Sequence, residues 1–511
     1  MCRRPAWTRA IFRLLPFALL LVLVSTVAFA RPGGGESYSG GGSGGGGGSS
    51  DAGDYLFVID ILIFVLQLVF EYPAIGIPLL VLLGAAFLFV KVKEGWSTAS
   101  NPPAGNVGTA TTSHEHVSAR KELERAFVLH DTNFSLPVFE DFLYFLYAEV
   151  ERARGSGTID QWTPYVSPEV RKTLRDRDAQ IAGKSLRAVD GIVIGAMSYK
   201  PGSVFNKNGR VSVTVLIDAN YTEHVEGGSS TRCFARSSLT LQRSTSAKSR
   251  EPGKAQILGC PNCGAPLQAV RGDVCSYCNA RIVPGKQDWA ITDFTVEKRT
   301  TVAPFLGSSV EEQGTDLASV VNPGIDLALT RLTEKDPAFT RERLQARVGV
   351  IFETLQQGWT ARDPLRIRPY MSDNLFQSQV YFIDLYKEAK AINRTDGARI
   401  TKIVFANVTT DAYYDAITLR VFAEGADYTE SEDGKLLSGH RKKKRKYSEY
   451  WTLLRGSNGT TIARDDRACP NCGAQLKIEM TGNCAHCRAK VTAGDFDWVL
   501  SRIEQDDSYV G

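Results

Sequence analysis

A four-cysteine pattern that occurs twice constrains this chain more than any other feature of its sequence. Each copy has the form C-x2-C-x11-C-x2-C, and the second copy follows the first after 209 residues (469 − 260 = 209 and 487 − 278 = 209). Two short C-x-x-C turns bring four thiolates to one point, which suits a tetrahedral zinc ion. The predicted metal ligands are Cys260, Cys263, Cys275, Cys278, Cys469, Cys472, Cys484 and Cys487.

The chemistry of these cysteines has three possible interpretations, of which we favour zinc. Disulfides and iron in a rubredoxin-like site are the alternatives. Four protein ligands leave no open position for a substrate water, so we expect two structural sites and no catalytic one. Reduced four-cysteine sites also fit a cytoplasmic domain better than an oxidising compartment. Gly264 and Gly473 follow the first knuckles, where the absence of a Cβ permits a positive φ.

The repeat extends beyond the cysteines. The Asp-Trp pair that ends each ribbon, at Trp289 and Trp498, keeps the offset of 209 residues. Upstream, "PYVSPEV" at Pro164 corresponds to "PYMSDNL" at Pro369, with an offset of 205 (369 − 164). A repeat of this length indicates two tandem modules, each carrying its own ribbon.

Both modules have the same predicted order of elements. Apolar residues recur at helical spacing from 339 to 359, with Thr340 as the N-cap and Ser135 in the same role in the first copy. A second helix is predicted from 372 to 391, and alternating strands follow it. One more strand follows each ribbon. The fold class is therefore α+β, with tandem helix-plus-antiparallel-sheet modules and a four-cysteine ribbon inserted between the last two strands of each.

The N-terminal part reads as an export and membrane region. Residues 1–30 have the charge and apolar run of a signal peptide, 31–54 form a Gly/Ser-rich linker, and 55–93 form a membrane segment before a second linker at 94–125. An uncleaved anchor in place of the signal, and a hairpin of two spans in place of one, are the alternatives. Lys91 and Lys93 close the last apolar stretch, which places the modules on the cytoplasmic face of a bacterial inner membrane.

One segment of the second module resembles a known family. The residues "DPAFTRERLQARVGVIFETLQQGWTARDPLRIRPYMSDNLF", with the later "YSEYWTLLRGS" and "DWVLSRIEQ", look like the domain of mitochondrial inner-membrane translocase subunit 44. The resemblance implies a cone-shaped fold similar to nuclear-transport-factor-two-like domains, with binding of acidic lipid or a protein partner. It does not extend to the mitochondrial import role, and the ribbons depart from the mitochondrial pattern.

With this resemblance, the chain divides into two modules. The first covers residues 126–300 with its ribbon at 258–283, and the second covers 331–507 with its ribbon at 467–492, joined by a linker at 301–330. The predicted lipid-binding or acidic-partner residues are six consecutive basic residues in the second module: Arg441, Lys442, Lys443, Lys444, Arg445 and Lys446. A solvated hairpin tip is the alternative interpretation of this run.

Composition and motifs narrow the function. The 60 basic and 56 acidic residues nearly balance, so nucleic acid is not an expected partner. The sequence contains no P-loop and no H-E-x-x-H motif, and no small-molecule substrate can be identified. We therefore expect a non-catalytic, membrane-anchored scaffold that binds a protein partner or acidic lipid. The alternative is a small-ligand-binding or catalytic pocket protein of the nuclear-transport-factor-two-like type.

Overall fold

The computed structural model describes residues 119–127, 130–179, 185–252, 258–301, 315–459, 468–506, 509 and 511. The predicted signal peptide, glycine-rich linker and membrane segment lie outside these residues. In the described part of the chain, no helix is long and apolar enough to cross a membrane. Both modules belong to one compact unit.

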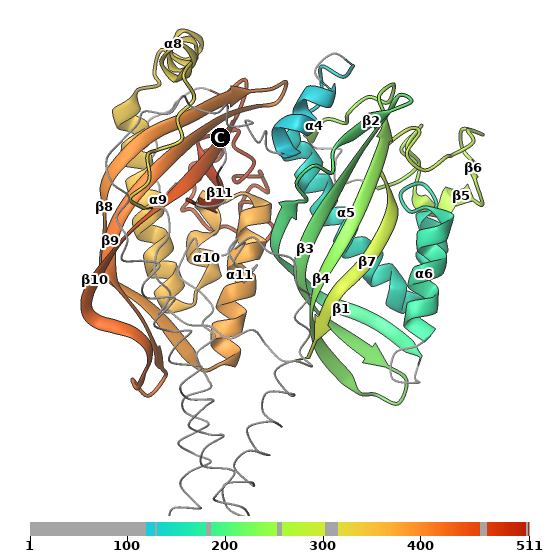
Figure 1. Ribbon diagram of the computed structural model, residues 1–511, viewed down its shortest axis with the longest axis horizontal. Helices are drawn as coiled ribbons and strands as arrows, with labels where there is room; N and C mark the ends of the chain where they lie inside the picture. The colour runs from blue at the N-terminus through green and yellow to red at the C-terminus, as the bar shows by residue number, and fades with distance from the viewer. Residues whose placement is uncertain are drawn as a thin grey trace, which may run out of the picture. The chain divides into compact units, whose positions relative to one another are not determined.

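The first module places helices against a five-stranded antiparallel sheet (Figure 1). The strand order is β1-β3-β4-β7, and the short β2 pairs with β3. The helices are α4 (Ala119–Phe127), α5 (Leu136–Ser156) and α6 (Pro168–Ala179), with the 3-10 turn η2 (Ile159–Trp162). The strands are β1 (Leu186–Tyr199), β2 (Phe205–Lys207), β3 (Arg210–Val225), β4 (Ser230–Ser244) and β7 (Ala290–Thr300). Within its ribbon lie η3 (Leu267–Ala269), β5 (Val270–Arg271) and β6 (Val274–Cys275).

The second module repeats this plan with four strands in the order β11-β10-β9-β8. Its helices are α8 (Ile325–Lys335), α9 (Arg341–Ala361), α10 (Pro364–Ile367) and α11 (Asp373–Glu388), with the 3-10 turn η4 (Arg368–Tyr370). Its strands are β8 (Ala391–Thr410), β9 (Tyr414–Ser431), β10 (Leu436–Gly456) and β11 (Val499–Gln505). Figure 1 shows α9, α10 and α11 lying along the curved sheet. The helix-plus-antiparallel-sheet class predicted from the sequence is confirmed.

The long helices begin where the sequence predicts. The Ser135 hydroxyl accepts a hydrogen bond from the Val138 N–H at 3.4 Å, and the Thr340 hydroxyl accepts one from the Arg343 N–H at 3.2 Å. Each cap satisfies a backbone donor that has no partner within the helix. Each helix then buries one apolar side in its module core, where α5 packs with β3 and β4, and α9 packs with β9 and β10.

Each ribbon interrupts the hairpin formed by the last two strands of its module. Strand β4 pairs antiparallel with β7, and β10 pairs antiparallel with β11, with a four-cysteine set between the two strands in both cases. The returning strand is also held from its other side, since Val166 bridges Ile291 and Met371 bridges Leu500, both parallel. The ends of each ribbon are therefore fixed by the sheet.

Two features of the fold differ from the elements that the sequence indicates. Strand β1 carries apolar residues on both faces, because its outer face packs against α11 of the second module. Its pattern therefore lacks the alternation by which half-buried strands are recognised. Strand β10 begins at Leu436, so the six basic residues lie within a strand and not in the turn at its end.

Candidate metal centres

All four C-x-x-C turns of the two ribbons adopt the same backbone geometry. The N–H of Gly264 donates to the carbonyl of Cys260 at 2.8 Å, and the N–H of Gly473 donates to that of Cys469 at 2.8 Å. The two glycines have φ of 77° and 71°, as their position predicts. The second knuckles close in the same way, with Asn279 and Arg488 in the left-handed region.

The sulfur atoms of each set converge on one point. In each set all four Sγ atoms lie within 4.8 Å of one another. The Sγ atoms of Cys260 and Cys278 are 3.8 Å apart, as are those of Cys263 and Cys275. Cys469 and Cys487 repeat this spacing at 3.8 Å. A tetrahedron with metal–sulfur bonds of about 2.3 Å has edges of about 3.8 Å, so both sets fit a four-coordinate metal ion.

An asparagine beside each site donates to one of the sulfur atoms. Asn262 Nδ2 lies 3.4 Å from the Sγ of Cys278, and Asn471 Nδ2 lies 3.4 Å from that of Cys487. These hydrogen bonds, with backbone N–H donors, lower the pKa of Cys278 and of Cys487 to about 6. At these two cysteines the thiolate form that a metal ion requires is therefore favoured at neutral pH, whereas hydrogen bonds with the neighbouring cysteines raise the pKa of Cys263 to about 12 and that of Cys472 to about 11.

The ribbons have little core apart from the metal ligands. The first packs Cys260 and Cys275 with Ala269, Val270 and Ile282, and the second packs Cys469 and Cys484 with Ile478 and Val491. Such small clusters cannot offset the conformational entropy of ordering the chain, and small domains of this kind depend on a metal or disulfides. We infer that the four-cysteine sets have a structural role.

The two ribbons dock on their modules through contacts that are only partly shared. In the first, the Tyr165 hydroxyl donates to the carbonyl of Gly259 at 2.8 Å, and Arg250 pairs with Asp288 at 2.8 Å. In the second, Arg368 Nε donates to the carbonyl of Met480 at 2.8 Å. Asp497, the counterpart of Asp288, also pairs with an arginine, Arg347, at 3.2 Å, so the attachments share this ion pair and differ at the Arg368 contact.

The six basic residues of β10 separate into two groups. Arg441 pairs with Glu430 at 2.9 Å, and Lys444 and Arg445 approach carboxylates of β9 at 3.5 Å. In the ladder between β9 and β10, Gly439 pairs with Tyr428, and the next paired residue, Lys444, is opposite Ala426. Residues 440–443 of β10 therefore face a single residue of β9 and form a bulge. The imidazole Nδ1 of His440 accepts from the backbone N–H groups of residues 442 and 443 and closes this bulge.

The first half of β10 carries exposed basic and exposed apolar side chains. Lys442, Lys443 and Lys446 are exposed and form no ion pair with another described residue. Leu436 and Leu437, at the start of the same strand, are 43% and 51% exposed. The hairpin of β9 and β10 therefore combines apolar surface with unpaired positive charge.

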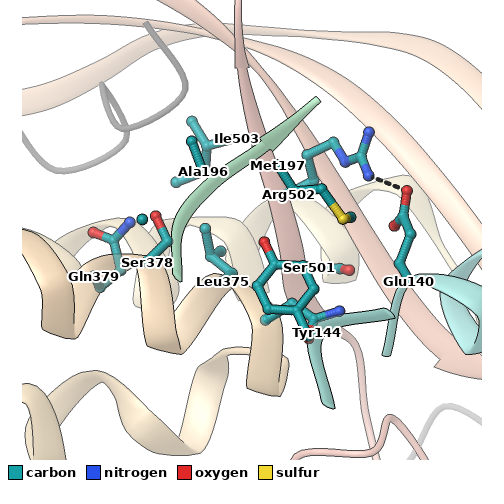
Figure 2. A pocket seen from close by; sticks show the side chains of 12 residues that line it. Glu140, Tyr144, Ala196, Met197, Leu375, Ser378, Gln379, Ser501, Arg502 and Ile503 are labelled. Carbon is teal, nitrogen blue, oxygen red and sulfur yellow. Dashed lines mark hydrogen bonds and ion pairs between the residues drawn. The ribbon is translucent and has the colours of Figure 1, made fainter. Parts of the chain in front are cut away.

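A pocket lies where α5 and β1 of the first module meet α11 and β11 of the second (Figure 2). Its volume is about 500 Å³, including the part open to solvent. On one side, Arg502 pairs with Glu140 at 2.7 Å, and on the other Gln379 and Ser378 project from α11. The Gln379 side-chain oxygen is buried without a hydrogen-bond partner among the described residues. Besides this ion pair, the polar side chains of the lining belong to Tyr144, Asn374, Ser378, Gln379 and Ser501.

Residues that the cysteine pattern does not include also contribute to the sites. Asn262 and Asn471 share the 209-residue offset (471 − 262 = 209), which is the signal by which the sequence could have identified them. The pocket residues have no such signal, because they come from four elements that are distant in the sequence. The structure brings together both predicted cysteine sets.

Comparison with known proteins places the second module in a defined class of α+β domains. Residues 325–463 match the family model of the Tim44-like domain, named after the translocase subunit that the sequence resembles. The match lies within the second module and its preceding helix α8, and the first module, which repeats the four-cysteine pattern, lies outside the matched residues. One matching solved structure is titled "Ntf2 like protein involved in plasmid conjugation"; it is 10% identical, with 73% of this chain and 96% of that chain covered and a TM-score of 0.16. No curated protein matches the chain.

Proposed function

We propose that the protein is a non-catalytic, membrane-anchored scaffold whose second module binds acidic lipid at the membrane surface. The observation that carries this proposal is the bulge of β10, where Lys442 and Lys443 lie on the same strand as the exposed Leu436 and Leu437. Near an anionic leaflet a lysine contributes about 1 kcal/mol, and apolar side chains add burial in the interface. Arg441, Lys444 and Arg445 instead hold β10 against β9.

The scaffold also needs a membrane anchor and two metal-stabilised ribbons. We propose that residues 55–93 anchor the chain in a bacterial inner membrane, with the modules on the cytoplasmic face. Both ribbons hold zinc as a structural ion, because four thiolates without an open position suit zinc and a reducing compartment. Lipid and the membrane are the proposed partners, and a protein partner with an acidic surface would use the same charges.

Lysine footprinting of the full chain tests the lipid proposal. The protein is reconstituted in nanodiscs of phosphatidylcholine alone or with phosphatidylglycerol, and acylation of each lysine is followed by mass spectrometry. We expect Lys442 and Lys443 to become about tenfold less reactive in the anionic discs, because contact with lipid phosphates excludes the reagent. High salt should restore their reactivity, since it screens these charges.

Two lysines of the first module provide the control within the same molecule. Lys200 and Lys207 are exposed but have no neighbouring basic run, so their reactivity should not depend on lipid charge. The double variant Lys442→Glu/Lys443→Glu should abolish the lipid-dependent protection of the hairpin, which is read at Lys435 and Lys446. Equal reactivity of Lys442 and Lys443 in both lipids would contradict the proposal.

A further inference from the structure

An ionic cluster attaches the second ribbon to the first turn of α11. The carboxylate of Asp373, the first residue of that helix, accepts from Lys490 Nζ at 2.7 and 2.9 Å. It also pairs with Arg368, which lies in the turn before the helix. Lys490 lies three residues after the last metal ligand, Cys487, so the metal-held part of the ribbon ends almost directly on this carboxylate.

The arginine of this cluster is buried against the ribbon. The Arg368 side chain is 1% exposed and donates to the carbonyl of Met480, between the two knuckles. Gly482, at φ 82°, lies so close that an added Cβ would be 2.4 Å from Arg368 Nη2. A buried guanidinium has lost its hydration and depends on its protein partners, so displacing the ribbon would remove one of the hydrogen bonds that compensate its charge.

The same end of α11 contacts the first module. Asn374, the residue after Asp373, donates through Nδ2 to the Asp141 carboxylate of α5 at 2.7 Å. Further along the helix, the Tyr381 ring would lie 2.9 Å from a Cβ added at Gly195 of β1, so α11 lies directly against that strand. The strand that leaves the ribbon, β11, makes a second link through Arg502 and Glu140.

The first ribbon lacks the corresponding contacts. The offsets of the repeat place Pro168 at the position of Asp373 (373 − 205) and Arg281 at the position of Lys490 (490 − 209). Proline has no carboxylate, and the Arg281 side chain is 78% exposed and pairs with Asp273 inside the ribbon. The link from ribbon to module interface is therefore a property of the second copy alone.

We propose that the second metal centre braces the interface between the two modules. Metal at the Cys469–Cys487 set orders the ribbon, and the ribbon holds Asp373 through Lys490 and Arg368. Asp373 in turn fixes the start of α11, which contacts α5 at Asn374 and β1 further along at Tyr381. Loss of this metal loosens the first module from the second, whereas the contacts of the first ribbon remain within its own module. The inference rests on the metal binding proposed above.

Hydrogen exchange of the full chain in detergent micelles tests this brace. The variant Lys490→Met keeps all eight cysteines, so about two metal ions per chain should remain bound by elemental analysis. We expect exchange in peptides of α5 around Asp141 and of β1 to rise about tenfold, because the local opening that exposes them becomes easier. Lys490→Arg should restore protection, and Cys469→Ser, which removes a ligand, should raise exchange as Lys490→Met does.

The matched control is Arg281→Met, which removes the basic side chain at the same position of the first ribbon. It should leave exchange in α5 and β1 unchanged. Unchanged exchange in Lys490→Met with its metal retained would overturn the brace, as would an equal rise in Arg281→Met. Absence of metal from the wild-type protein would instead contradict the proposed zinc sites. The comparison of Lys490→Met with Arg281→Met would still decide whether the ion pair of Lys490 with Asp373 protects α5 and β1 from exchange.

Discussion

In each module a buried aspartate–arginine pair lies against the tryptophan that follows the ribbon. Arg243 pairs with Asp131 at 2.7 Å, and its guanidinium is 5.4 Å from the centre of the Trp289 ring. The second module repeats this arrangement with Asp336, Arg455 and Trp498. A buried charge that loses its partner is strongly destabilising, so all three residues are constrained together. This explains why the tryptophan at the end of each ribbon is part of the repeat.

Asp141 is a residue at which stability should depend on pH. Burial, followed by the charges of Asp373 and Glu140, raises the pKa of Asp141 from 3.8 to about 7; Asn374 and Lys490 act in the opposite direction. A raised carboxyl pKa means that the folded state keeps a proton that the unfolded state releases. The resulting stability is complete below pH 3.8 and is lost as the pH rises to about 7.

We therefore expect Asp141→Asn to be more stable than the wild type, by an amount that grows between pH 6 and pH 8. The growth should be on the order of 1 kcal/mol, since the folded-state pKa of about 7 lies within this range and one pKa unit corresponds to about 1.4 kcal/mol. The amide can still accept from Asn374. Pulse proteolysis of the full chain in urea at pH 6 and pH 8 measures the free energy of unfolding of the variant and the wild type. A gain in stability that does not depend on pH would refute the assignment of this effect to Asp141.

At the scale of the element, each ribbon is a long insertion that depends on its metal. Cys260→Ser removes one ligand of the first site, and we expect it to destabilise the β4–β7 hairpin by several kcal/mol. Structural zinc supplies about 10–16 kcal/mol of apparent binding free energy in small sites. Losing even part of this free energy is a large change compared with the free energy of unfolding of one module. Hydrogen exchange in β4 and β7, compared with β10 and β11 of the same chain, measures the effect.

Ser276→Ala serves as a control in the same ribbon, because it leaves all four ligands in place and removes only a hydroxyl that bonds to the carbonyl of Ala269. It should cost about 1 kcal/mol at most. Full retention of β4 and β7 protection in Cys260→Ser would show that the first ribbon does not need its metal.

Local signals in the sequence predict most elements of these modules, and contacts between distant residues account for the rest. The C-x-x-C turns and the caps at Ser135 and Thr340 are set by residues within a few positions, so spacing alone identifies them. The bulge of β10 depends on its register against β9, which spacing does not encode. The pairing of Lys490 with Asp373 joins residues 117 apart (490 − 373) and has no counterpart in the first copy.

At the scale of the whole molecule, duplication produced two modules with different surroundings. The outer face of the first sheet packs on α11 through Gly195 and Phe234. The corresponding face of the second sheet instead receives the segment around Val320 and the C-terminal Tyr509, both at Tyr450. The two copies therefore keep the same core and ribbon, while their outer faces have diverged.

The proposed zinc sites and the proposed orientation in the membrane can be tested on the same membranes. Membranes from cells that express the chain should yield about two zinc ions per protein, with the eight ribbon cysteines reduced, because four thiolates and a tetrahedral spacing fit zinc. Protease added to the cytoplasmic side of inverted vesicles should digest the modules, and protease added to intact spheroplasts should not. Oxidised cysteines without metal, digested from the outer side, would contradict both the zinc proposal and the cytoplasmic placement. Reduced, metal-bound modules that are digested from outside would contradict only the orientation, since a hairpin of two spans would produce that result.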